Sequence, residues 1–269
     1  MSSRHLVPVS PRHSVAVDEE YEALIEKAPQ QDYVLRTLAR RMAGESPLMT
    51  GELVIGGRAT RDEFPLARTY PLHFRKTYYT ARLRGDPRRE FECHTRASEI
   101  VGVPPPIGHA LGTFRSCLLP GRPYSQLSPF GAEPEESNIK VAADLPLATA
   151  AGLWRLAEEL HTILSRLQAA GMTHGDAELH NFIVCPTPLE VMPIDFELAV
   201  IESEVKSDEW TSRCENDMIP ILREAIFLQC ALGEQPGPLA ESALERLDSL
   251  FRSGGQFHRA IDRRSNTTR

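Results

Sequence analysis

Apolar residues recur at two different periods along the chain, which separates helical from strand-like segments. Residues 18–42 carry apolar side chains at helical spacing, interrupted at Pro29, and this pattern predicts two short helices. Residues 1–17 mix proline, serine and histidine without a period, as is typical of a poorly ordered leader. We expect the two helices to pack against the domain that follows.

The next part of the chain has a strand-like pattern. Residues 52–55 and 72–81 are short β-rich runs separated by Gly56-Gly57 and a polar loop with Pro65, which predicts a small antiparallel sheet. A charged stretch over residues 87–101 predicts a helix, and residues 111–119 predict a further strand. Residues 124–144 are rich in serine, proline and glutamate and indicate an exposed connection.

The second half of the chain begins with a clear amphipathic helix that ends at Gly171. One face of this helix is apolar and comprises Leu153, Leu156, Leu160, Ile163, Leu164 and Leu167. Two short strands are predicted over residues 182–184 and 191–194, followed by helices over 217–232 and 239–251. The Gly- and Arg-rich residues 253–269 are expected to form a flexible basic tail.

Composition narrows the function classes. With 269 residues and 41% apolar content, the chain can bury a substantial core. A formal net charge of -7 argues against nucleic acid or a membrane surface as partner. The five cysteines are scattered and form no short pair, so neither a disulfide framework nor a zinc cluster is indicated. No apolar run reaches the roughly 18 residues that span a bilayer, and a cytoplasmic location is expected.

One segment carries a chemical motif. His174, Asp176 and Asn181 stand in the pattern H-x-D-x-x-x-x-N, and Asp195-Phe196 follows after two predicted strands. Transfer of a γ-phosphoryl group requires a carboxylate that orients the acceptor hydroxyl and accepts its proton, together with oxygen ligands that hold Mg²⁺. Asp176 suits the first role, and Asn181 and Asp195 suit the second, because a hairpin between them would bring the two together.

These loops resemble the catalytic and metal-binding loops of the protein-kinase-like superfamily, which includes eukaryotic-like and RIO-type protein kinases, aminoglycoside phosphotransferases and choline kinases. The resemblance implies an α+β, bilobal fold with a β-rich N-lobe and a reduced helical C-lobe. It also implies ATP and Mg²⁺ as cofactors. We expect a leader with helices over residues 1–48, an N-lobe over 49–121, a C-lobe over 122–252 and the tail over 253–269.

The resemblance also assigns nucleotide-binding residues in the N-lobe. Lys76 is similar to the lysine that binds the α- and β-phosphates, with Arg75 as the competitor if the strand register differs by one residue. Its acidic partner is expected to be Glu92, and otherwise Glu90. Leu118 and Leu119 lie in a run that resembles the hinge beside adenine. In the C-lobe, Asp217 resembles the aspartate that supports the catalytic loop.

Several positions depart from the family pattern. Gly56 and Gly57, with Gly51, do not complete the G-x-G-x-x-G loop; they either contact the nucleotide or form a plain turn. Glu178 replaces the lysine that is usual in protein serine/threonine kinases, and a carboxylate there would repel phosphate unless it faces away or binds a cation. Glu197 makes the metal motif Asp-Phe-Glu, a form often seen in choline-kinase-like enzymes.

The sequence therefore predicts a kinase that transfers the γ-phosphate of ATP to a hydroxyl, with a protein serine or threonine narrowly favoured as acceptor. Glu178, Glu197 and the short C-lobe favour a small-molecule acceptor instead. A nucleotide-binding pseudokinase is the third interpretation, since the Gly-rich loop is degenerate. Retention of Asp176, Asn181 and Asp195 weighs against it.

Overall fold

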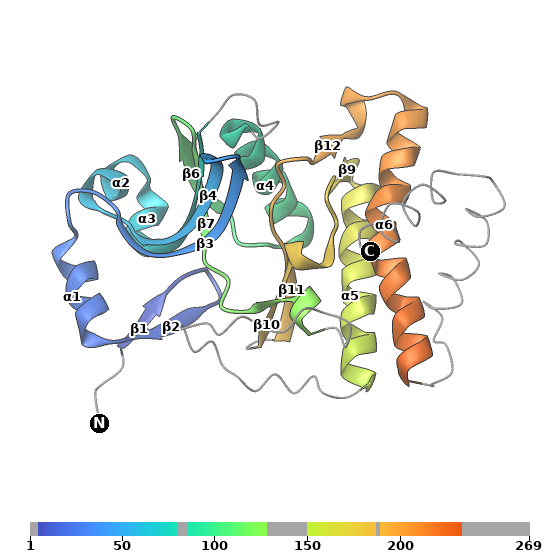
Figure 1. Cartoon of the computed structure of the whole chain (residues 1–269), viewed down its shortest axis with the longest axis horizontal. Helices are drawn as coiled ribbons and strands as arrows, with labels where there is room; N and C mark the ends of the chain where they lie inside the picture. Colours follow the sequence, from blue (N-terminus) through green and yellow to red (C-terminus); the bar gives the residue numbers. More distant parts are fainter. Residues whose placement is uncertain (1–4, 80–85, 128–149, 187–188, 233–269) are drawn as a thin grey trace.

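The computed structural model describes residues 5–79, 86–127, 150–186 and 189–232. These residues form two lobes, with a β-sheet in the first and two long antiparallel-packed helices in the second (Figure 1). The expected helix over residues 239–251 and the tail over 253–269 lie outside the described residues. The α+β, bilobal fold class predicted from the sequence is confirmed.

The first lobe is built on a five-stranded sheet in which all neighbouring strands are antiparallel. Its strands, in spatial order, are β3 (Tyr33–Ala43), β4 (Ser46–Ile55), β5 (Leu72–Tyr78), β7 (Thr113–Cys117) and β6 (Pro106–Ala110). Helix α4 (Pro87–Val101) follows β5 and has the bounds predicted from the sequence. Asp86 caps its first turn and Gly102, at φ 77°, ends it.

Strand β3 replaces the second helix that the apolar spacing predicts before residue 43. It pairs with β4 through a tight turn in which Gly44 has φ 61°. Three of the apolar residues that suggested a helix, Val34, Leu38 and Met42, are more than 40% exposed on this edge strand. Their spacing therefore does not mark a buried helical face, and pairing with β4 decides the conformation. The sheet thus begins before residue 49, and the predicted lobe boundary falls inside β4.

The described part of the predicted leader is folded. Strands β1 (His5–Pro8) and β2 (Ser14–Val17) form a hairpin, followed by α1 (Glu19–Lys27), which confirms the first of the two predicted helices. Val7, Val9 and Val17 are buried with Leu53, Ile55 and Leu72 of the sheet. The hairpin turn reaches the second lobe, where Arg12 pairs with Glu190 at 2.7 Å. Burial of the three valines explains why the prediction of disorder is wrong here.

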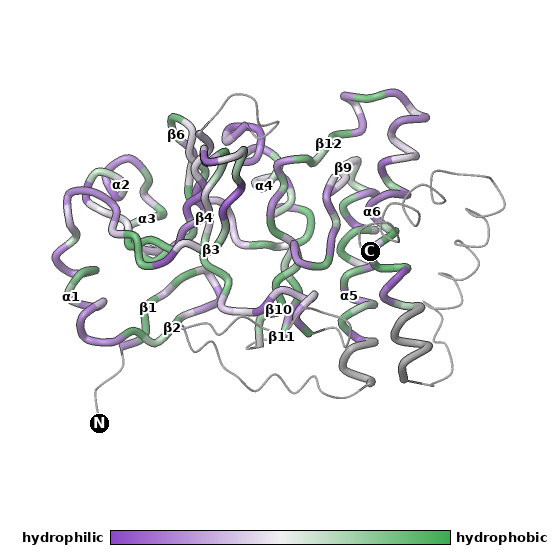
Figure 2. Tube along the Cα trace, viewed as in Figure 1, coloured by the Kyte–Doolittle hydropathy of each residue, from purple (hydrophilic) through white to green (hydrophobic). Residues whose placement is uncertain are grey.

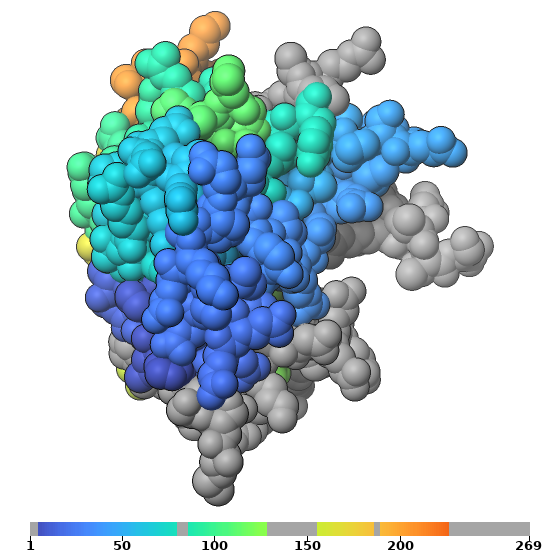
Figure 3. Space-filling view, turned by 90° about the vertical axis from the view of Figure 1, so that its left-hand side faces the viewer, coloured from blue at the N-terminus to red at the C-terminus, as the bar shows by residue number. Residues whose placement is uncertain are grey.

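Two short helices, α2 (Arg58–Glu63) and α3 (Pro65–Thr69), occupy the predicted polar loop between β4 and β5. The Phe64 side chain between them packs under the Arg115 guanidinium and against Gly108. On the same face Asp32 pairs with Arg75 at 2.9 Å and with Arg115 at 2.7 Å. Figure 3 shows the N-terminal segment (dark blue) beside α2 and α3 (cyan), with the lighter blue β3–β4 hairpin projecting outwards.

The second lobe is built on α5 (Ala150–Ala169) and α6 (Ser207–Leu232), which pack side by side (Figure 1). Hydrophobic turns of α5 appear green beside α6 in Figure 2, and Leu156, Leu160, Leu164 and Leu167 are fully buried there. Along the chain, four short strands come between α5 and α6: β9 (Met172–Thr173), β10 (Phe182–Pro186), β11 (Leu189–Pro193) and β12 (Val200–Ile201). Helix α6 begins before the predicted start at residue 217.

The chain crosses between the lobes over residues 118–121 and then forms β8 (Arg122–Pro123), which pairs with β10. The helical turn Tyr124–Gln126 follows. Tyr124 is fully buried in the core of the second lobe, so the predicted exposed connection is wrong at its first residue. Most of that predicted connection, residues 128–149, lies outside the described residues.

Candidate active site

Lys76 lies in the middle of β5, and its side chain is 3% exposed. Its Nζ atom is 2.6 Å from Asp195 Oδ1, 2.8 Å from Glu197 Oε2 and 3.4 Å from Glu90 Oε1. The neighbouring Arg75 points to the opposite face of the sheet, where it contacts Asp32 and Glu52. Because successive residues of a strand face opposite sides, this register excludes Arg75 from the site. The predicted lysine is therefore the one that faces the second lobe.

Glu90, rather than Glu92, is the acidic partner on α4. Glu90 is buried against Lys76, whereas Glu92 is half-exposed and pairs with Arg88 at 2.9 Å. Two residues along an α-helix turn the side chain by about 200°, so only one of the two glutamates can face the sheet. The preferred assignment, Glu92, is wrong, and the alternative, Glu90, is correct.

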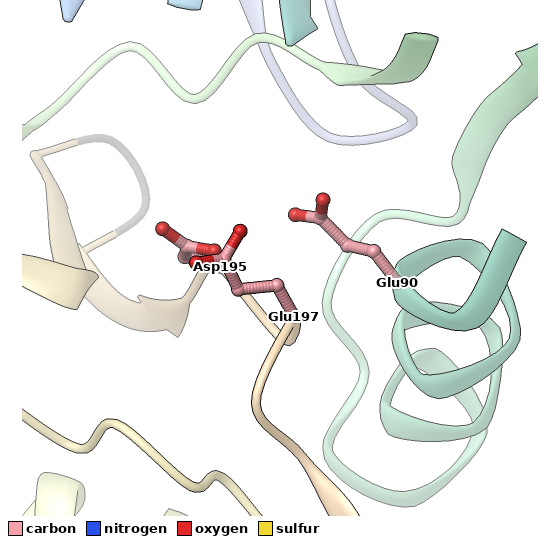
Figure 4. Close-up of side chains that lie close together, drawn as sticks. All are labelled: Glu90, Asp195 and Glu197. Carbon is pink, nitrogen blue, oxygen red and sulfur yellow. The ribbon is translucent and has the colours of Figure 1, made fainter. Parts of the chain in front are cut away.

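The charged groups around Lys76 are strongly coupled. Burial acts to lower the pKa of Lys76, but Glu90, Asp195 and Glu197 outweigh it and raise that pKa, so the lysine stays protonated. Burial raises the pKa of Glu90 to about 7, despite the opposing effect of Lys76. Figure 4 shows the carboxylates of Glu90, Asp195 and Glu197 directed toward a common space. Their nearest oxygens lie within 4.8 Å of one another.

Asp176 and Asn181 meet in the loop before β10. Asn181 is buried, and its Nδ2 donates to the backbone oxygen of Asp176 at 2.9 Å and to Asp176 Oδ2 at 3.1 Å. Because the amide nitrogen makes both bonds, the amide oxygen of Asn181, Oδ1, faces away from Asp176. The hairpin of β10 and β11 returns the chain as expected, and Ile194 N donates to Asn181 O at 2.8 Å. Asp195 thus follows immediately beside Asn181.

Asp217 on α6 holds the start of this loop. Its carboxylate accepts from His174 N at 2.5 Å and from Gly175 N at 2.9 Å, which is the supporting contact that the resemblance implied. Burial raises the pKa of Asp217 to about 6, although the two N–H donors act in the opposite direction. His174 is fully buried and its ring lies beside those of Phe182 and Phe196, so it anchors the loop by packing.

Two backbone conformations in the loops are unusual. Gly175 has φ 84°, and a Cβ at this position would lie 2.0 Å from the Leu198 carbonyl oxygen. Only glycine fits, which explains the form His-Gly-Asp. Asp195 has φ 64° without being glycine, a conformation that costs about 1–3 kcal/mol and persists where the surroundings impose it. Phe196, fully buried against His94 and His174, fixes the loop next to Asp195.

Gly56 and Gly57 do not lie near Lys76. They follow β4 at the end of the strand remote from the β3–β4 turn, and Gly57 N donates to Asp32 at 3.0 Å. A Cβ on Gly56 would lie 2.9 Å from the His73 ring, and one on Gly57 would lie 2.4 Å from the Gln31 backbone. Close packing explains both glycines, so their assignment to the nucleotide is wrong. The turn that occupies the place of a Gly-rich loop contains Gly44 instead.

Leu118 and Leu119 lie in the crossing between the lobes. Leu118 packs on the apolar cluster of the first lobe and Leu119 on that of the second. The two residues thus lie where the chain passes from the first lobe to the second, and contact with adenine stays a prediction.

Three residues that were not singled out from the sequence contact the site residues: Tyr78, Arg41 and Arg223. The Tyr78 hydroxyl donates to Glu90 and lies 3.0 Å from Glu197 Oε2. Arg41 Nη1, near the β3–β4 turn, is 3.7 Å from Glu197 Oε1. Strand alternation from Lys76 points to Tyr78, whereas Arg41 fell in the segment misassigned as helix. Arg223 of α6 is 3.6 Å from Glu178, so that carboxylate has a cationic partner.

The donor set suits Mg²⁺ and a triphosphate. Mg²⁺ prefers oxygen ligands, which Asp195 and the side-chain oxygen of Asn181 offer on adjacent strand ends. A buried, protonated lysine beside them offers a counter-charge to phosphate. The described residues therefore fit the magnesium–nucleotide group that the resemblance implied.

Comparisons with known proteins give structural likenesses but no sequence match. No family model matches the sequence, and no curated protein matches it. The kinase PK-1 of Cydia pomonella granulovirus is similar at a TM-score of 0.40 and 13% identity, over 68% of this chain and 58% of the viral chain. The chain thus spans less than two thirds of that kinase. No helix among the described residues is long and apolar enough to cross a bilayer.

A likeness at this level adds no residue roles, and the fold is assigned from the chain itself. Three features define it: the five-stranded antiparallel sheet with Lys76 on its third strand, the Lys76–Glu90 pair, and the loop from His174 to Asp195 held by Asp217. Together they give this chain the two-lobed arrangement that the resemblance to the protein-kinase-like superfamily implied.

Proposed function

We propose that the chain is an ATP- and Mg²⁺-dependent phosphotransferase that transfers the γ-phosphate to a hydroxyl. The observation that carries the proposal is a continuous set of contacts. Lys76 of β5 binds Asp195, and Asn181 binds Asp176. The β10–β11 hairpin joins the loop that carries Asp176 and Asn181 to the loop that carries Asp195. The residues to which we assign phosphate binding, metal binding and proton transfer are thus linked by these contacts.

Each residue has a role in this proposal. Asp176 orients the acceptor hydroxyl and takes its proton, while Asn181 orients the Asp176 carboxylate through Nδ2. Asn181 and Asp195 hold Mg²⁺, which supplies neutralisation of the phosphate charge. Lys76 binds phosphate oxygens, and Glu90 keeps the lysine in position. Leu118 and Leu119 flank the adenine.

A protein serine or threonine is the acceptor we propose. Two residues that favoured a small molecule have partners inside the protein: Glu178 faces Arg223, and Glu197 binds Lys76 and Tyr78. Neither therefore needs a cationic acceptor to balance its charge. The short helical lobe still favours a small hydroxylated molecule, which is the second candidate. We also propose a location in the cytoplasm, because five scattered cysteines suit a reducing compartment. The net charge of -7 supports the proposal of no nucleic-acid or membrane partner.

The test is transfer of label from γ-labelled Mg-ATP into a cell extract, separated into macromolecules and small molecules. Asp176→Ala is the negative control, and Asp208→Ala, an exposed aspartate at the start of α6, is the matched control. Label in protein that depends on Asp176 supports a protein kinase. Label in small molecules replaces that acceptor with a metabolite. Tight Mg-ATP binding with no transfer to either fraction or to water would support a pseudokinase.

A further inference from the structure

The β3–β4 turn offers few backbone groups for binding phosphate, so a phosphate contact at this end of the sheet would have to come from side chains. Among the residues of this turn, Gly44 is the one glycine, so the close backbone approach of a Gly-rich loop is missing. Two arginines, Arg40 and Arg41, stand near the turn on β3. A guanidinium binds phosphate bidentately and can replace backbone N–H donors.

The strand register places one of these arginines on the face of Lys76. Ala39 pairs with Gly51, and Gly51 pairs with Lys76, so these three positions share a face. Arg41, two residues after Ala39, lies on that face as well, whereas Arg40 lies on the other. Arg40 is exposed and makes no ion pair with any residue that the structure describes. Arg40 is therefore a matched control: it carries the same charge on the same strand, but it lies on the opposite face of the sheet.

Glu197 connects the two cations. Its Oε1 is 3.7 Å from Arg41 Nη1, and its Oε2 is 2.8 Å from Lys76 Nζ. A carboxylate held between an arginine and a lysine marks a place where an anion is favoured. The Arg41 side chain is 58% exposed, so its contact with one carboxylate is weak and exchangeable. A phosphate group carries more charge and accepts two guanidinium hydrogen bonds.

We propose that Arg41 binds the distal phosphates of a nucleoside triphosphate and that Glu197 holds the guanidinium beside the site until nucleotide takes its place. This inference rests on the proposed function. It assigns to a side chain the phosphate contact that the β3–β4 backbone lacks. Lys76 and Arg41 then contact the phosphates from the middle and from the end of the sheet.

The test is equilibrium binding by calorimetry in the presence of Mg²⁺, with ATP and adenosine as the two probes. Loss of a charge-assisted hydrogen bond predicts that Arg41→Ala weakens ATP binding about tenfold to a hundredfold. Adenosine affinity should not change, because adenosine has no phosphate. Arg40→Ala should leave both affinities unchanged, which controls for the lost positive charge. Arg41→Lys should recover part of the ATP affinity, since lysine keeps the charge without the bidentate geometry.

Three outcomes would overturn the inference in distinguishable ways. Equal ATP affinity in Arg41→Ala and wild type would remove Arg41 from phosphate binding and leave the proposed function standing. Tighter ATP binding by Arg41→Ala would mean that the Arg41–Glu197 contact hinders nucleotide binding instead of being replaced by it. A wild-type protein that binds neither ATP nor adenosine would overturn both the proposed function and the role of Arg41.

Discussion

Lys76 and Asp195 form an ion pair between the two lobes, with 2.6 Å between Nζ and Oδ1. Lys76 is fixed in the central strand of the sheet, and Asp195 is fixed by a left-handed backbone conformation next to the buried Phe196. The contact therefore joins the two lobes at the site. Three carboxylates and one lysine share this small volume, so the negative charges outnumber the positive one.

Replacing Lys76 leaves Glu90, Asp195 and Glu197 without their shared cation. Loss of one partner of a buried pair costs roughly 3–5 kcal/mol, so Lys76→Met should lower the free energy of unfolding by that order. The second variant, Lys76→Met with Glu90→Gln, should recover part of the loss because one buried charge is removed. Urea denaturation measures both, with the exposed Lys206→Met as control. A double variant that is no more stable than Lys76→Met would contradict the coupling.

Tyr78→Phe removes the hydroxyl that lies between Glu90 and Glu197. The two carboxylates then lose a donor in a buried site, at about 1–3 kcal/mol in the free energy of unfolding. Tyr79→Phe is the control, because Tyr79 is 52% exposed and its hydroxyl contacts Thr50 instead. Thermal melting of the two variants measures the difference in their stability. Equal stability of the two would show that the Tyr78 hydroxyl does not hold the carboxylates.

Gly175→Ala introduces a Cβ 2.0 Å from the Leu198 carbonyl oxygen at a residue with φ 84°. The catalytic loop must then move, and we expect activity to fall by about a hundredfold or more because the base is displaced. Gly102→Ala separates this effect from backbone strain, since Gly102 has φ 77° but no atom within 4 Å of the added Cβ. That control should lose only about 1 kcal/mol of stability and keep its activity. Similar activities in the two variants would refute the steric explanation.

Asp217 gives the stability a defined pH dependence. Its folded-state pKa is about 6, raised from 3.8 by burial, so the folded protein holds the proton more tightly than the unfolded chain. The protonated form therefore favours folding, and its contribution is lost as the pH rises from about 4 to about 6. Relative to Asp217→Asn, wild type should lose roughly 3 kcal/mol over that range. Denaturation of both proteins at several pH values measures this difference, and a gain of wild type with rising pH would contradict the assignment.

The motif residues could be predicted from sequence because their spacing is local. The loop from His174 to Asn181 and the hairpin to Asp195 are short, so the sequence alone places Asp176, Asn181 and Asp195 together. Helix α4 was bounded correctly because Asp86 and Gly102 give clear start and stop signals.

The remaining errors arise from packing between distant segments. Choosing Glu90 over Glu92 requires the rotation of α4 relative to the sheet, and the sequence of α4 contains both glutamates without that reference. Strand β3 has apolar residues at helical spacing, and only its pairing with β4 shows that it is an edge strand. Arg41 was missed for the same reason, because its direction depends on that pairing.

The most direct test of the central claim is a single-turnover measurement of ATP consumption with Mg²⁺ and extract-derived acceptor. Wild type and Asp208→Ala are expected to form ADP at the same rate. Asp195→Ala should lose activity by at least about a hundredfold, because it removes a metal ligand and the partner of Lys76. Its circular dichroism spectrum should show a folded protein. An Asp195→Ala variant that keeps wild-type turnover would contradict the assignment of this site as a phosphotransferase centre.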